Sequence, residues 1–191
     1  MRVSPLLAIL VMVLAHAGCS KDYVSGSEGD VIFRIVDING GELLESDVLF
    51  DDGSVVTILP DIVDVTVANR PKNPLTDVPH VAMAIFVERY EVSYTRSDGR
   101  NTPGVDVPFG FTGRLTSAVD VAASGNNLTI PLTVVRQQQK DEPPLRNLIG
   151  LGGQRIFTAT AQITLHGRTT AGQAVTSTGF LTISFADFAN N

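Results

Sequence analysis

Cysteine is nearly absent from this chain of 191 residues, in which Cys19 is the only one. No disulfide can form within the chain, so the fold must depend on apolar burial and on sheet hydrogen bonds. Tryptophan is missing and tyrosine occurs three times, so few side chains could stack on sugars. Beyond the apolar run at 6–14, no stretch approaches the roughly 20 apolar residues of a membrane-spanning helix.

Basic residues are also scarce. The chain has 14 lysines and arginines against 20 acidic residues, which gives a formal net charge of −6. No basic patch with interleaved aromatic residues occurs along it, and an acidic chain is repelled by phosphate backbones. We therefore expect no nucleic-acid partner.

The first 19 residues carry the strongest signal in the sequence. Arg2 gives a positive start, Leu6 to Leu14 is an almost unbroken apolar run, and Ala17 and Gly18 precede Cys19. A charged start, a short apolar core and a small-residue exit are typical of an export signal, and this core is too short to span a membrane. We therefore expect residues 1–18 to be a signal peptide.

The cysteine at the exit of that signal resembles the lipobox of bacterial lipoproteins. The resemblance covers residues 1–19, with His16 where the family usually has an aliphatic residue. It implies that Cys19 carries lipid, palmitate included, becomes the new N-terminus and anchors the protein to a membrane. Ser20, in place of an aspartate, implies the outer membrane. The alternative is a plain secretory signal cut after Ala17 or Gly18, which would leave Cys19 as a free thiol.

The remainder divides into a linker and one domain. Residues 19–29 follow with small and polar side chains and no periodicity, as expected of a flexible tether. Removal of residues 1–18 takes away one arginine and brings the formal net charge to −7. The domain expected over 30–191 is long enough to bury a substantial core.

Strict alternation marks the last two strands. Along 155–168 and 174–185, apolar and small side chains occupy every second position, with threonine, serine and glutamine between them and Phe180 as the exception. A period of two indicates one buried and one solvated face, as in antiparallel sheets. The short link 169–173 contains Gly172, so the two segments predict a hairpin.

Shorter segments of the same kind precede this hairpin. They are separated by Gly, Pro, Asn and Asp and lie at 31–36, 47–50, 54–58, 63–69, 82–96, 107–119 and 128–137. Pro131 requires an edge strand or a bulge. One short helix is expected near 143–149, which begins with prolines and is followed by Gly150. The fold class expected is all-β: an antiparallel two-sheet sandwich of about eight strands that resembles immunoglobulin-like domains in architecture only.

Few residues suit catalysis or a transition metal. His80 and His166 do not form a zinc-ligand spacing, and no second thiol is available. The sequence has no G-x-S-x-G nucleophile motif, and Cys19 would be consumed by lipid. We expect no enzyme, no cofactor and no metal centre.

Calcium is the open alternative to that expectation. Two acidic loop clusters could supply oxygen ligands, although neither has the EF-hand spacing and the same residues are common in ordinary turns. The clusters are Asp37, Asn39 and Glu42, and Asp98, Asn101 and Asp106.

Strand direction predicts where a binding surface would lie. Consecutive antiparallel strands alternate in direction, so we expect the connections 97–106 and 138–154 at one end and the tether at the other. Long loops on a rigid scaffold often carry binding. The candidate binding residues in these loops are Asp98, Arg100, Asn101, Asp106, Arg146 and Asn147.

These patterns predict a non-enzymatic, lipid-anchored cell-envelope lipoprotein whose β-sandwich binds or scaffolds another envelope protein. The alternative is a carrier or receptor lipoprotein for a small ligand or a calcium ion. An apolar pocket with a few convergent polar groups would favour that alternative.

Overall fold

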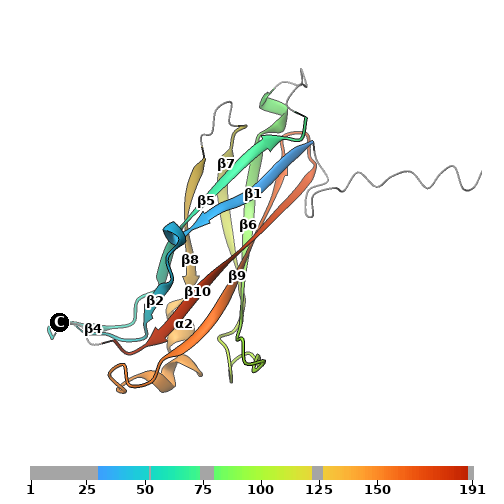
Figure 1. Ribbon diagram of the computed structural model, residues 1–191. Helices are drawn as coiled ribbons and strands as arrows, with labels where there is room; N and C mark the ends of the chain where they lie inside the picture. The colour runs from blue at the N-terminus through green and yellow to red at the C-terminus, as the bar shows by residue number, and fades with distance from the viewer. Residues whose placement is uncertain (1–29, 52, 74–79, 122–126, 189–191) are drawn as a thin grey trace, which may run out of the picture.

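The computed structural model describes residues 30–51, 53–73, 80–121 and 127–188, which form an all-β sandwich of two sheets (Figure 1). The predicted signal peptide, Cys19 and the tether lie outside the described residues. In the part of the chain that the structure describes, no helix has the length and apolar character needed to cross a membrane.

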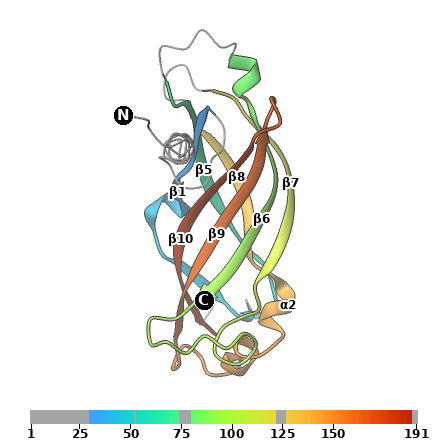
Figure 2. The same ribbon diagram turned by 90° about the vertical axis from the view of Figure 1, so that its right-hand side faces the viewer.

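The two sheets contain eight of the ten strands. The larger sheet has the order β2 (Leu44–Asp47), β10 (Ala174–Ala186), β9 (Phe157–Thr169), β6 (Ile85–Thr95) and β7 (Phe111–Val119). The smaller sheet has the order β1 (Val31–Ile38), β5 (Asp61–Pro71) and β8 (Leu128–Val135). Figure 2 shows β10, β9, β6 and β7 side by side, with β5 and β8 behind them. A small hairpin of β3 (Phe50–Asp51) and β4 (Val56–Thr57) stands apart.

The hairpin predicted from alternation is confirmed. β9 and β10 pair antiparallel from Arg168 opposite Ala174 to Phe157 opposite Phe185, with Gly172 in the turn at φ 86°. The alternate residues predicted to be inward are buried, and the rings of Phe157 and Phe185 stack with centroids 5.3 Å apart. The predicted exception, Phe180, is 65 % exposed on the outer face.

The chain changes sheets between β1 and β2. β1 pairs with β5 in the smaller sheet, whereas β2 pairs with β10 of the larger sheet in parallel. The turn between them is the 3-10 helix η1 (Asn39–Gly41), in which all three residues have positive φ. The strand order is that of an immunoglobulin-like sandwich. The described residues form ten strands where about eight were expected. One of the additional strands arises because residues 44–57 form three very short strands where two were expected.

Strand ends differ from the prediction at several places, and two of these differences have a clear local cause. β7 begins at Phe111, because residues 102–107 form a hydrogen-bonded turn that closes on Thr102. β8 ends at Val135 and is followed by the one-turn helix α2 (Gln137–Lys140). Pro131 lies on β8, which is an edge strand, as its missing N–H requires.

Two further 3-10 helices complete the described elements. One, η3 (Leu145–Leu148), is the short helix predicted near 143–149, and its Leu145 and Leu148 are buried against the core. The other, η2 (His80–Met83), precedes β6. At that end of the sandwich the buried Asn69 side chain joins the sheets, because its Nδ2 donates to the carbonyls of Met83 and Val119 at 2.8 and 3.0 Å.

The register of β10 predicts unequal costs for truncation on its two faces. Ile183→Ala should lower the free energy of unfolding by about 2–5 kcal/mol, because Ile183 is fully buried. The adjacent Thr182→Ala should cost less than about 0.5 kcal/mol, since Thr182 is exposed. Denaturant unfolding of both variants checks this prediction. Equal losses would mean that both faces of the sheet are covered.

Candidate functional site

The two connections predicted to adjoin lie at the same end of the sandwich, which we call the loop end. Residues 96–110 join β6 to β7 and residues 136–156 join β8 to β9, and both occupy the lower end in Figures 1 and 2. Val31, where β1 begins, lies at the opposite end. The two loops therefore adjoin as predicted, while the tether itself lies outside the described residues. The strand count behind the prediction differs, because β3 and β4 form a small separate hairpin.

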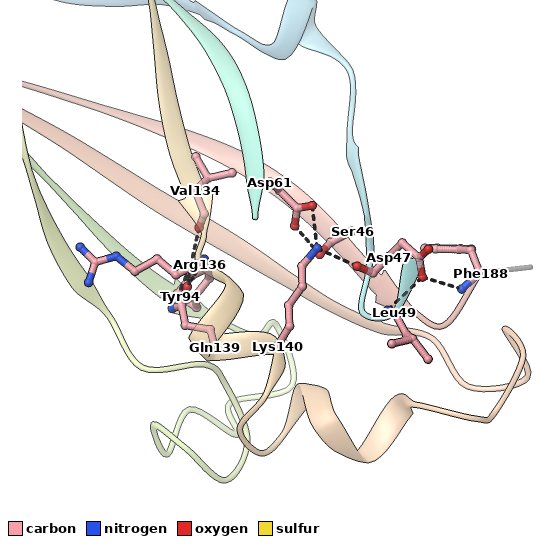
Figure 3. A network of polar contacts seen from close by, with 10 residues as sticks. All are labelled: Ser46, Asp47, Leu49, Asp61, Tyr94, Val134, Arg136, Gln139, Lys140 and Phe188. Carbon is pink, nitrogen blue, oxygen red and sulfur yellow. Dashed lines mark hydrogen bonds and ion pairs between the residues drawn. The ribbon is translucent and has the colours of Figure 1, made fainter. Parts of the chain in front are cut away.

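A buried lysine forms the base of the loop end. Lys140, the last residue of α2, is 1 % exposed, and its Nζ lies 2.8 Å from Asp61 Oδ1 and 2.6 Å from the carbonyl oxygen of Asp47. Ser46 Oγ donates to the other carboxylate oxygen of Asp61 at 2.5 Å (Figure 3). The ammonium thus joins α2 to the start of β5 in one sheet and to the end of β2 in the other.

Burial and charge act on Asp61 in opposite directions. Desolvation raises the pKa of the Asp61 carboxyl, while the Lys140 charge and the hydrogen bonds from Lys140 and Ser46 lower it. The desolvation effect is larger, so the pKa stays above its ordinary value. The pair therefore holds the fold together only while both partners are present, because either charge alone would be buried without compensation.

A second buried contact ties the two connections to each other. Gln139, beside Lys140, accepts a hydrogen bond from the Arg136 amide at 2.7 Å, and its Nε2 donates to the Phe109 carbonyl in the other connection. Tyr94 Oη lies 3.3 Å from Gln139 Oε1 and also donates to the Val134 carbonyl in the opposite sheet (Figure 3). Burial raises the pKa of Tyr94 far above its ordinary value, so the phenol remains a donor.

The 97–106 loop is held by ion pairs of its own. Asp98 accepts hydrogen bonds from Arg96 Nε at 3.1 Å and from Arg96 Nη2 at 2.5 Å. Asp106 Oδ1 lies 3.2 Å from both Nε and Nη2 of Arg100. A hydrogen bond from the Arg100 amide, together with Arg96, lowers the pKa of Asp98. Partial burial raises the pKa of Asp106, but hydrogen bonds from Thr102 and the Arg100 charge outweigh this and lower it overall. Both carboxylates are therefore ionised at neutral pH.

A cleft of about 220 Å³ opens between the two connections. Three of the six predicted binding residues line it, namely Arg100, Asp106 and Asn147. Asp98 and Asn101 lie outside the lining and hold Arg96, since Asn101 Oδ1 accepts the Arg96 amide at 2.6 Å. Arg146 is exposed on η3 and does not line the cleft.

The sequence analysis did not single out the other lining residues, among them four at or next to strand ends: Arg96, Arg155, Phe157 and Thr158. They belong to strand ends, which the alternation pattern treats as scaffold, and their place at the cleft follows from the pairing of β6 with β9. Only one signal could have found them, which is that Arg96 and Arg155 flank the two predicted loops.

Several side chains of the two proposed calcium clusters form hydrogen bonds within their own loops. Asp37 Oδ2 accepts the Gly40 amide at 2.9 Å, and Asn39 Nδ2 donates to the carbonyls of Glu42 and Leu43, which stabilises η1. The second cluster serves the arginines described above. Among the described residues, no three His, Cys, Asp or Glu side chains gather as metal ligands. Calcium binding stays a prediction.

A larger groove of about 640 Å³ lies elsewhere, between β1, η1 and β10. Its lining is mixed, with five aliphatic residues and the exposed Phe180 beside the polar residues Asp37, Glu42 and Thr182. No local pattern in the sequence indicated this groove, because it forms where the chain leaves one sheet for the other.

The buried ion pair predicts a strongly non-additive response. Asp61→Asn alone should cost about 3–5 kcal/mol of unfolding free energy, because it leaves the Lys140 ammonium buried without a counter-charge. Asp61→Leu with Lys140→Met should cost much less, since apolar pairs of similar volume often replace buried ions without loss. Equilibrium denaturation of the two variants measures the difference. An equal or larger cost in the double variant would contradict this account.

Comparison with known proteins does not identify a relative: no family model matches the chain, and no match was found among curated proteins.

Proposed function

We propose that this protein is a non-enzymatic lipoprotein of the bacterial cell envelope, anchored through Cys19, and that its domain is a binding module for another envelope protein. The observation that carries the proposal is the position of the loop end, opposite the end at which β1 begins. β1 begins at Val31, two residues after the last residue of the expected tether, so a lipid at Cys19 would direct the cleft away from the membrane. The outer membrane is the location that Ser20 favours.

The stiffness of the loop end supports a binding role. Binding costs less free energy when the contacting groups are already ordered. Here Gln139 and Lys140 hold one connection to both sheets, and the arginine–aspartate pairs hold the other. Such loops can present Arg100 and Asn147 in a fixed geometry.

A second candidate function has its own observation. The groove between β1 and β10 has a volume within the range of small-molecule sites and combines aliphatic walls with two carboxylates. These properties favour the alternative of a lipid-anchored carrier for a small, mainly apolar ligand. Binding of such a ligand beside the Phe180 ring, with no effect on the loop end, would favour the carrier over the binding module.

The anchor is tested at Cys19. The native protein should incorporate labelled palmitate and sediment with membranes, because two or three acyl chains on one residue hold a protein stably. Cys19→Ser should abolish labelling and either block processing or release the domain. Cys19→Ser protein that lacks residues 1–18 and still sediments with membranes would contradict the anchor.

The binding surface is tested by capture from the protein's own membranes. Arg100→Ala combined with Arg146→Ala should reduce recovery of a partner by at least about fivefold, while the melting temperature changes little, because both side chains are exposed. Arg89→Ala, on the outer face of β6, is the matched control and should leave recovery unchanged. Equal recovery by all three proteins would place the partner elsewhere.

A further inference from the structure

The lining of the cleft at the loop end is positively charged, although the molecule as a whole is negatively charged. Its lining contains Arg96, Arg100 and Arg155 against the single carboxylate of Asp106, whereas the whole chain has a formal net charge of −6. Asn147 and Thr158 add an amide and a hydroxyl to the same lining. Donors of these kinds, brought to one hollow by two connections, are suited to an anion.

Two of the three guanidinium groups are held in place with donors left over. Arg96 gives Nε and Nη2 to Asp98, and the Phe157 ring lies 4.9 Å from its guanidinium carbon. Arg100 gives Nε and Nη2 to Asp106. Within the described residues, neither Nη1 has a hydrogen-bond partner. Each group is thus fixed along one edge and keeps a free terminal nitrogen, as a preorganised oxyanion donor requires.

Arg155 supplies the charge that the aspartates do not neutralise. Its exposed side chain has no hydrogen bond and no ion pair among the described residues. Arg96 and Arg100 each have a carboxylate beside them, so their net attraction for an anion is reduced. Most of the excess positive charge in the cleft therefore comes from Arg155.

The size of the cleft limits what it can hold. About 220 Å³ accommodates one carboxylate or phosphate group with a short attachment, and is smaller than a typical drug-sized site. Val105 and Ile156 are exposed in the same lining, so an apolar neighbour of the anionic group could pack beside it.

We propose that the cleft between the two connections is an oxyanion site, in which Arg155, Arg96 and Arg100 bind a carboxylate or phosphate group. This site specifies the chemistry of the proposed binding function. It depends on that function only in one respect, which is that the envelope partner would supply the anionic group. The guanidinium fork matches the two oxygens of either anion.

The test is a titration of the purified full-length protein at constant ionic strength, followed by NMR or calorimetry. Inorganic phosphate and N-acetylalanine are the two probes, and N-acetylalanine amide is the uncharged control. Arg155→Ala should weaken binding of the preferred anion by at least about tenfold, the loss expected for one charge-assisted hydrogen bond. The matched control Arg89→Ala removes an exposed arginine on the outer face of β6, outside the cleft, and should change binding less than twofold.

Preference for one probe identifies the anion as carboxylate or phosphate. Binding by neither probe, or equal loss in Arg155→Ala and Arg89→Ala, would overturn the proposal, as would equal binding of the amide. The titration contains no partner, so its result is independent of the capture experiment. Retained partner capture with no anion binding would remove the oxyanion site and leave the binding function in place.

Discussion

The buried ammonium of Lys140 is the constraint on which the loop end depends. A lysine with 1 % exposure has lost nearly all its water, and in its place it donates hydrogen bonds to Asp61 and to the Asp47 carbonyl. Those two acceptors lie on different sheets, so the position of α2 is fixed relative to both. Removal of either charge would leave the other buried and unpaired, which makes the arrangement all-or-none.

The neighbouring residues extend this constraint to the candidate site. Gln139 lies in the same helical turn as Lys140 and donates to the Phe109 carbonyl. This bond ties the connection that contains Asn147 to the connection that contains Arg100. Tyr94 adds a bond from β6 to the β8 carbonyl of Val134. The cleft therefore lies on a rigid base, although its own walls are loops. Arginine–aspartate pairs order the wall formed by residues 96–106, whereas no aspartate among the described residues neutralises the charge of Arg155.

Much of the scaffold could be predicted from local pattern. The β9–β10 hairpin follows from alternation, because a period of two allows only one face to be buried. Pro131 predicted an edge strand or a bulge, because proline has no N–H to donate to a neighbouring strand, and β8 is an edge strand. The prediction was weaker at 44–57 and at 107–110, where strands are short or replaced by turns and few residues define a period.

The sequence by itself determined the all-β class, the hairpin, the short helix near 145–148 and the two loops in which binding residues were sought. Each depends on residues close together along the chain. Only the tertiary structure decided that Lys140 is buried against Asp61, 79 positions away, that Arg155 and Arg96 meet the loop residues in one cleft, and that a groove opens beside Phe180. These features depend on which strands pair and on where the chain changes sheets, and no local period encodes either.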